Sequence, residues 1–290
     1  MKTICIYEEP NNYFLPEFKG SFFEPLKVKK NSLLYYVYGV CSVLSLPMRR
    51  FFWGDWKQEI KSCNRVILFD YGYRSGMEKY IKRINPDCKV FLYCWNHVDA
   101  AHDVSRKYSE KSNIYSSDLG DCNDYGYTFA PVCYAKSLSR SYKECGNKLF
   151  FCGNNKGRKD LVQSFAKKLG ESGVGCDLFF PESREQYLGY YDYLDKLDGY
   201  DILLDVNQNG QQGFSLRVLE SIYLSKKLFT TNEIIKNFDF YNPNNIFIMD
   251  ADPNKLDNNA VNEFLAAPYE QVSKDILDEY DYKNWVNFFN

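Results

Sequence analysis

The sequence predicts an α/β protein with two successive units, each built on a sheet of parallel strands. Short apolar runs alternate with amphipathic stretches along the chain, which is typical of strands that helices cover on both faces. Two such alternations follow each other without a long repeat period, and a short polar segment at 141–147 separates them. The predicted domains are therefore residues 1–145 and 146–290, and helices from about residue 269 could cross back to the first domain.

In both units, strands are expected where apolar residues run together, and helices where apolar residues recur on one face. The expected strands of the first unit are 3–7, 65–70, 90–94, 114–115 and 128–130, with a helix at 77–84. The expected strands of the second unit are 148–152, 176–180, 201–205, 228–231 and 246–249, with helices at 160–169, 183–197, from 215, and within 269–290.

The composition indicates a soluble globular protein. Hydrophobic residues make up 45% of the 290 residues, charged residues make up 26%, and the formal net charge of −2 gives no general attraction to nucleic acid. The ten cysteines include no CxxC pair and several lie in apolar runs, so we expect reduced thiols in a cytoplasm. The first residues lack the apolar core of a signal peptide, which again favours a cytoplasmic protein.

An almost uncharged stretch at 32–47 is shorter than the ~20 residues that span a membrane. It leads into 47–57, and residues 27–61 contain seven Lys or Arg against two acids. One interpretation is a buried helix with a solvated basic end. The other is peripheral contact with the inner face of the plasma membrane through 47–57. In that case anionic headgroups would meet Arg49 and Arg50, and the interface would hold Phe51, Phe52, Trp53 and Trp56.

The stretch at 213–232, GFSLRVLESIYLSKKLFTTN, combines a glycine, an amphipathic helix and a short strand. A helix N-terminus offers unpaired N–H groups and partial positive charge to a phosphate. Glu220 stands about two turns into this helix, where a carboxylate can accept hydrogen bonds from ribose hydroxyls. This order of features suits a nucleotide diphosphate.

Five segments of the second half share a family pattern: FFCGNNKGR (150–158), DVNQNGQQG (205–213), SLRVLE (215–220), KKLFTTN (226–232) and FDFYNPNNI (238–246). With them, the second half resembles the nucleotide-sugar domain of GT-B glycosyltransferases, particularly small bacterial enzymes of capsule and lipopolysaccharide clusters. The resemblance covers roughly residues 148–250, and the first half matches only in general layout. It implies two Rossmann-type domains whose parallel sheets face each other across a cleft.

The resemblance also implies roles for individual residues. Many retaining members carry two glutamates separated by seven residues, of which the second contacts the donor ribose. Glu220 matches the second glutamate, but Gln212 stands in place of the first, and an amide supplies no negative charge. Lys156 and Arg158 are implied to stabilise the leaving phosphate, on which negative charge develops. The predicted catalytic residues are Gln212, Arg158 and Lys156, and the predicted donor-binding residues are Glu220, Gly153, Gly213, Phe214, Ser215, Leu216 and Arg217.

No metal site and no cofactor are predicted. The two histidines have no cysteine pair near them, and the DxD at 250–252 reads equally well as a capped turn before Pro253. A general base would be needed only by an inverting enzyme, because a departing phosphate can take the acceptor proton in a retaining one. The candidates for that base in the first unit are Glu8, Glu9, Asp70 and His97.

The predicted function is transfer of a sugar from a nucleotide-sugar donor to an acceptor glycan, which could be lipid-linked, in bacterial surface polysaccharide synthesis. We expect the reaction to be metal-independent and to retain the anomeric configuration. Two alternatives stay open. One is a catalytically degenerate scaffold that binds nucleotide or glycan, which Gln212 favours. The other is a sugar-nucleotide epimerase, which can share the two-domain shape.

Overall fold

The computed structural model describes residues 1–8, 17–18, 20–98, 104–207 and 212–290. The chain forms two compact units: the first is Met1–Ala130 with Phe289–Asn290, and the second is Pro131–Phe288. Each unit contains one sheet of parallel strands with helices between the strands, so the α/β class predicted from the sequence is confirmed. The predicted domain boundary at 145/146 stays a prediction.

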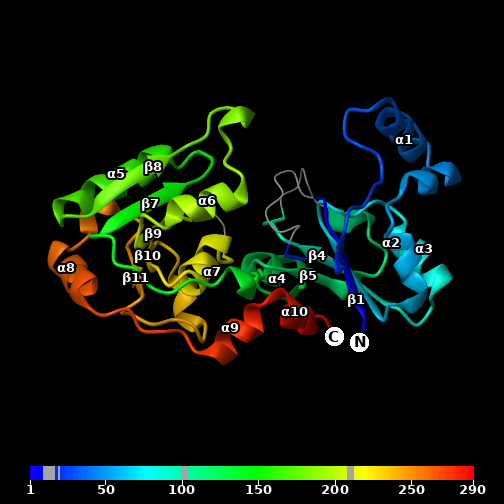
Figure 1. Ribbon diagram of the computed structural model, residues 1–290. Coiled ribbons are helices and arrows are strands. Elements are labelled where there is room, and N and C mark those ends of the chain that lie inside the picture. The colour runs from blue at the N-terminus through cyan, green and yellow to red at the C-terminus, as the bar shows by residue number, and fades with distance from the viewer. Residues whose placement is uncertain (9–16, 19, 99–103, 208–211) are drawn as a thin grey trace. The chain divides into compact units, whose positions relative to one another are not determined.

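The sheet of the first unit has the strand order β2-β1-β3-β4-β5-β6, and every neighbouring pair is parallel. Its central strand β3 is buried along its whole length, as a strand covered on both faces must be. The strands are β1 (Thr3–Ile6), β2 (Phe22–Phe23), β3 (Arg65–Phe69), β4 (Lys89–Cys94), β5 (Ile114–Ser116) and β6 (Thr128–Phe129). The helices are α1 (Leu33–Val43), α2 (Trp56–Glu59), α3 (Met77–Ile84) and α4 (Leu119–Tyr125), and a 3₁₀ helix η1 spans Pro47–Phe52 (Figure 1).

Two tryptophans form part of the core of the first unit. Trp53 is 1% exposed and Trp56 is fully buried, and their rings pack against Tyr80. The indole of Trp56 also donates to the carbonyl of Pro25 at 3.1 Å. Of the two interpretations of this segment, the one that places Trp53 and Trp56 at a membrane interface is therefore wrong for these two residues. The helix α2 and the end of η1 turn both indoles inward, where their large apolar area stabilises the core.

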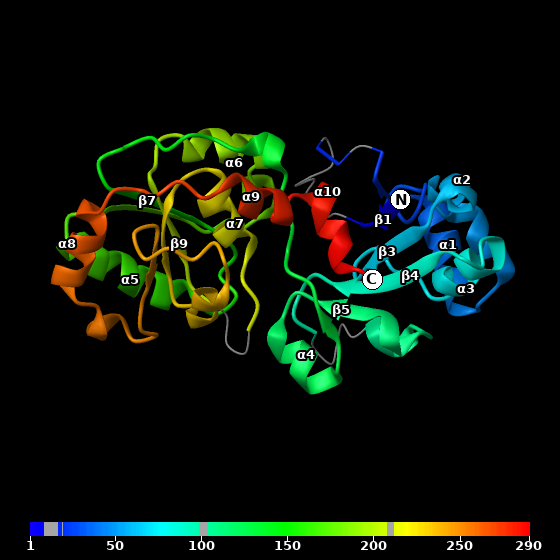
Figure 2. The same ribbon diagram turned by 90° about the horizontal axis from the view of Figure 1, so that it is seen from below.

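The sheet of the second unit has the strand order β11-β10-β9-β7-β8, again with parallel neighbours. Side chains alternate along β7, so Phe151 packs in the core beneath α5 and α8 while Phe150 meets Tyr193 of α6 on the opposite face. Figure 2 shows α5 and α6 on opposite faces of this sheet. The strands are β7 (Lys148–Cys152), β8 (Gly175–Phe179), β9 (Ile202–Asp205), β10 (Lys227–Thr230) and β11 (Ile246–Ile248). The helices are α5 (Lys159–Glu171), α6 (Tyr190–Leu197), α7 (Leu216–Tyr223), α8 (Asn258–Ala266), α9 (Lys274–Tyr280) and α10 (Tyr282–Trp285).

The order of the second sheet creates a switch point between β7 and β9. From β7 the chain moves outward to β8, and it then returns to the other side of β7 to form β9. In open α/β sheets, ligands bind outside the carboxyl ends of the strands at such a reversal. The carboxyl ends of β7 and β9 are therefore the place where a ligand site is expected.

Candidate functional site

Two arginines meet at the carboxyl end of β7. If Gly153 carried a Cβ atom, that atom would lie 3.4 Å from Nη2 of Arg158 and 3.5 Å from Nη2 of Arg217. Both guanidinium groups also lie over the ring of Phe151, at 5.5 and 4.9 Å from its centroid. Gly153 thus leaves open the space into which two cationic groups converge, and Phe151 supports both of them.

The segments that follow β7 and β9 hold these arginines in place. Arg158 is the last residue before α5, and its Nη1 donates to the carbonyl of Val206 at 2.5 Å. Arg217 lies in the first turn of α7, and its Nη2 donates to the carbonyl of Cys152 at 2.7 Å. The switch point of the sheet therefore brings together two residues that are 59 positions apart, 158 and 217.

The carboxylate of Asp205 offsets the positive charge of the two arginines only in part. Asp205, at the end of β9, accepts from Nη1 of Arg217 at 3.0 Å and from Ser215 at 2.8 Å. Its other oxygen accepts from Thr230 at 3.3 Å. Burial opposes the charge of Arg217, but Asp205 together with Tyr193, Glu220 and Cys152 outweighs that effect and raises the pKa of this guanidinium. Within the described part of the chain, Arg158 has no ion-pair partner.

The electrostatics of Arg158 favour an anion. Burial and the positive charge of Arg217 lower its pKa, although a guanidinium stays protonated at any physiological pH. In addition, the Nε atoms of Arg158 and Arg217 are buried without a hydrogen-bond partner in the described residues. A bound phosphate would relieve the repulsion between the two cations and could accept from several of their N–H groups at once.

Lys156 precedes Arg158 in a tight turn. It adopts a left-handed backbone with φ of 41°, and the next residue, Gly157, has φ of 77°. Lys156 is exposed, and its pKa is lowered by partial desolvation and by the charge of Arg158. A third cation therefore lies in the loop that carries Arg158.

The N-terminus of α7 is anchored beside this pair. Ser215 is the N-cap residue, but its hydroxyl bonds to Asp205 and does not cap the helix. The carbonyl of Gly213 accepts from the side chain of Asn232 at 3.0 Å. Phe214 is buried against the ring of Phe238 at 4.8 Å. Leu216 begins the helix half-buried, and Gln212 is exposed at the end of the loop whose residues 208–211 lie outside the described residues.

Glu220 occupies a buried polar cluster. It is 4% exposed, and its two carboxylate oxygens accept from the phenols of Tyr190 and Tyr193 at 2.9 Å each. Tyr190 also bonds to the phenol of Tyr134 at 2.8 Å. Burial raises the pKa of Glu220, and Arg217 opposes that shift. The ribose contact stays a prediction, and it would require a ribose hydroxyl to displace one of these phenols.

Asp205, Phe151 and the tyrosines of α6 belong to this region but were not predicted as site residues from the sequence. Asp205 begins the segment DVNQNGQQG (205–213). The feature that could have identified it is an acidic residue at the end of an apolar strand, ten residues before Ser215. Tyr190 and Tyr193 stand at i and i+3, so they share one face of α6. Their partner on α7, Glu220, lies 30 residues after Tyr190 and 27 after Tyr193, and it could not be inferred from spacing.

The first unit has its own polar residues at the carboxyl ends of its strands. Asp70 follows β3 and accepts from the backbone N–H of Tyr71 at 2.8 Å, while burial raises its pKa to about 6. His97 follows β4, and its Nδ1 lies 2.8 Å from Asp121. Glu8 forms ion pairs with Lys30 and Arg74. Glu9 lies outside the described residues.

His97, Asp118 and Asp121 are close enough together to hold a metal ion, with ligand atoms within 4.8 Å of one another. Both carboxylates already have structural roles. Asp118 caps α4 through the N–H of Gly120 at 2.8 Å, and Asp121 accepts from Ser116 at 2.8 Å. At the predicted DxD, Asp250 pairs with Lys255 at 3.1 Å and Asp252 caps the following 3₁₀ turn.

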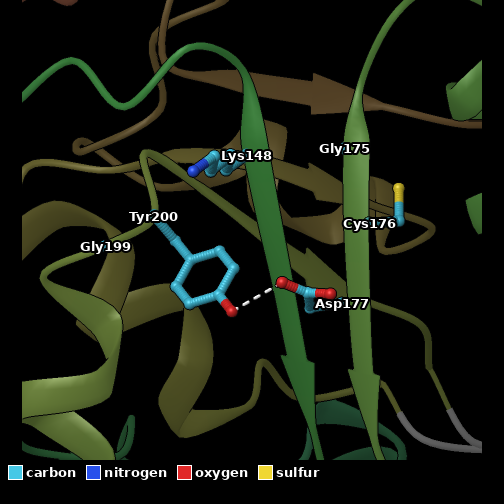
Figure 3. Close-up of a pocket in the computed structure, with 6 residues that line it drawn as sticks. All are labelled: Lys148, Gly175, Cys176, Asp177, Gly199 and Tyr200. Atoms are coloured by element: carbon cyan, nitrogen blue, oxygen red, sulfur yellow. Dashed lines mark hydrogen bonds between the residues drawn. The ribbon is translucent and has the colours of Figure 1, made fainter.

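A separate pocket of about 360 Å³ lies at the amino ends of the strands of the second sheet (Figure 3). Its lining includes Lys148 and Gly175, the first residues of β7 and β8, and Tyr200 donates to Asp177 across it at 2.6 Å. Because it is at the amino ends of the strands, it does not belong to the arginine site.

The chain has structural likenesses among solved proteins, but no sequence relative was found. No protein-family model matches the chain, and no curated protein matches its sequence. Among solved structures, the chain is similar to TarM, with 12% sequence identity and a TM-score of 0.47. The match covers 87% of this chain and 58% of the TarM chain, so this chain spans little more than half of that length.

Proposed function

We propose that this chain is a glycosyltransferase that binds the phosphates of a nucleotide-sugar donor at Arg158 and Arg217. The observation that supports the proposal is the convergence of both guanidinium groups beside Gly153 at the switch point of the second sheet. The resemblance of 148–250 to the nucleotide-sugar domain of GT-B enzymes assigns the same segments to the donor.

The chemistry of glycosyl transfer fits such a pair. When the bond between the sugar and the phosphate breaks, negative charge develops on the leaving phosphate oxygens. Arg158 and Arg217 are held in position before the reaction, so they stabilise that charge without reorganising. Lys156 adds a third positive charge from the preceding turn. Three cations supply the stabilisation that a metal ion gives elsewhere, and we therefore propose a metal-independent reaction.

The acceptor side of the proposal is a glycan of bacterial surface polysaccharide, and Gln212 is the proposed contact to the transferred sugar. An amide at that position can bond to a sugar hydroxyl. Retention of configuration is the proposed outcome, in which the departing phosphate takes the acceptor proton. Product anomers determined by NMR test this part separately.

Release of free nucleotide from a panel of UDP-, GDP-, CMP-, dTDP- and ADP-sugars, with EDTA present, tests the proposal. We expect one donor to be consumed by the wild-type protein and Arg158→Ala to lower that rate by about 100-fold, since one charged contact is worth about 1.5–3 kcal/mol. Arg83→Ala, at an exposed arginine of α3, is the matched control and should keep the wild-type rate.

The non-catalytic alternative has one observation in its favour. Gln212 carries no charge, so the family's first acidic position lacks its carboxylate. Nucleotide binding that depends on Arg158 without turnover of any donor would favour the scaffold. Turnover without added acceptor would exclude a pure binding protein.

A further inference from the structure

The helix α1 is apolar around its whole circumference. Tyr38 and Cys41 point into the core of the first unit, where Tyr38 packs on Phe52 at 6.0 Å between ring centroids. The opposite side is equally apolar and faces solvent. A helix that is apolar on all sides is normally buried in a core or in a membrane. One side of α1 therefore faces water, although its apolar side chains favour a nonpolar environment.

The exposed side of α1 continues into the turn and η1 that follow. Of the sixteen large apolar side chains exposed in the described residues, ten lie between 33 and 51. Val43 is 84% exposed, Leu33 is 79% exposed and Phe51 is 71% exposed. We call these ten residues the apolar surface: Leu33, Leu34, Tyr36, Val37, Val40, Val43, Leu44, Leu46, Met48 and Phe51.

The apolar surface is one continuous feature. The turn after α1 is closed by the N–H of Leu46, which donates to the carbonyl of Cys41 at 2.8 Å, and η1 then packs against α1. Figure 1 shows α1 at the periphery of the first unit, beyond α2 and α3. Soluble monomers rarely leave apolar patches of this extent uncovered, and such patches mark interaction sites.

The charged residues within 25–54, the segment that carries the apolar surface, all have one sign, and one of them, Lys30, pairs with Glu8 at 3.3 Å. Residues 25–54 contain five Lys or Arg and no Asp or Glu. Lys27 and Lys29 are exposed on the segment before α1, and Arg49 and Arg50 are half-buried in η1. Exposed aliphatic side chains flanked by cations are complementary to a bilayer whose headgroups are anionic.

We propose that the apolar surface docks on an anionic lipid bilayer, with α1 lying in the plane of the headgroups. The helix has 11 residues, whereas a spanning helix needs about 20. No helix in the described residues is long and apolar enough to cross a membrane. The docked state therefore buries one side of α1 in the bilayer boundary while the other side stays in the protein core.

The same observations disfavour a protein partner. A second copy of this chain would bring two identical segments 25–54 together, and each of them contains five cations and no acid. Protein interfaces also concentrate tryptophan at their centres, but Trp53 and Trp56 are buried in the core here. If this chain is the proposed glycosyltransferase, docking places its acceptor on a lipid, and only this last consequence rests on the proposed function.

Flotation of the purified protein with vesicles, without any donor, tests the proposal. We expect binding to vesicles that contain phosphatidylglycerol and much weaker binding to phosphatidylcholine alone. The double variant Val40→Glu with Val43→Glu changes two exposed positions and should weaken binding by about 100-fold or more, the value of two buried side chains. Arg49→Gln with Lys29→Gln should weaken it about tenfold and reduce its dependence on salt.

Matched controls keep the test independent of folding. Tyr125→Glu changes another exposed apolar residue of the first unit, and Lys167→Gln removes a charge from the second unit. Both should bind vesicles as the wild type does, and all variants should keep the wild-type circular dichroism spectrum. Absence of binding to anionic vesicles would overturn the proposal. A wild-type dimer that the two glutamates convert to a monomer would also overturn it and assign the surface to a second copy.

Discussion

Arg158 and Arg217 direct their Nη2 atoms to the same open space beside Gly153, at 3.4 and 3.5 Å from the position of its missing Cβ. In the described residues, Arg217 has an ion-pair partner in Asp205 and Arg158 has none. Like charges repel, and burial strengthens that repulsion because it weakens screening by water. Asp205 offsets part of this repulsion, and an anion bound beside both arginines would offset more of it.

The first prediction concerns the two ways of replacing Arg158. Arg158→Ala should lower the affinity for a nucleoside diphosphate by about 10–100-fold, because a charged hydrogen bond contributes about 1.5–3 kcal/mol. Arg158→Lys should recover only part of that loss, since lysine cannot bind two phosphate oxygens in the planar fork that arginine offers. Isothermal titration measures both affinities. Equal affinity of the wild type and Arg158→Ala would remove Arg158 from the site.

The second prediction concerns the space at Gly153. A Cβ atom there would lie 3.3 Å from Phe151 and close to both guanidinium groups, so Gly153→Ala should move them apart or fill the anion position. We expect a loss of about tenfold in diphosphate affinity, equal to about 1.4 kcal/mol, with little change in melting temperature.

Gly170→Ala is the control for that substitution. Gly170 lies in α5, and a Cβ there would meet nothing within 4 Å. This variant should bind the diphosphate normally and be more stable by about 0.5–1 kcal/mol, because alanine favours the helix over glycine. If both alanine variants bound alike, the open space beside Gly153 would have no role in binding.

The third prediction separates the two roles of Glu220. Glu220→Gln should lower stability by about 1–2 kcal/mol, because the phenols of Tyr190 and Tyr193 lose a charged acceptor. The predicted ribose contact adds a second expectation: affinity for a nucleoside diphosphate falls, while affinity for inorganic pyrophosphate does not change. A loss of stability with both affinities unchanged would assign Glu220 to the tyrosine cluster alone.

The fourth prediction concerns pH. The carboxyl of Asp70 has its pKa raised from 3.8 to about 6 by burial, so between these values the folded state binds more protons than the unfolded state. The free energy of unfolding should therefore fall as pH rises through this window, by about 1–3 kcal/mol in total. Asp70→Asn should remove this dependence in urea unfolding measured from pH 4 to about 7. An unchanged slope would mean that another group titrates.

The sequence predicted the sheets well because their strands are short apolar runs, and β7 was predicted with both of its bounds correct. The helix expected at 183–197 begins only at Tyr190, since Gly189 and the preceding loop interrupt it. The strand β2 was missed because two phenylalanines give no period. These errors concern local signals that tertiary packing overrides.

The candidate site was predictable only in part. Arg158, Arg217 and Gly153 were named from the sequence, and the structure places them together. The burial of Glu220 was not foreseeable, because it depends on tyrosines of another helix. The orientation of α1 could not be decided either, since both of its sides are apolar and the sequence does not show which one packs on the core.

The most direct test of the account is calorimetric titration of the wild type, Arg158→Ala and Arg217→Ala with UDP, GDP, CMP, dTDP and ADP. Arg83→Ala serves as the control for loss of an exposed arginine. The account predicts that one nucleotide binds the wild type and the control, and that each arginine variant of the pair binds it at least about tenfold more weakly. Binding that is unaffected in both variants, or no binding of any nucleotide to the wild type, would contradict it.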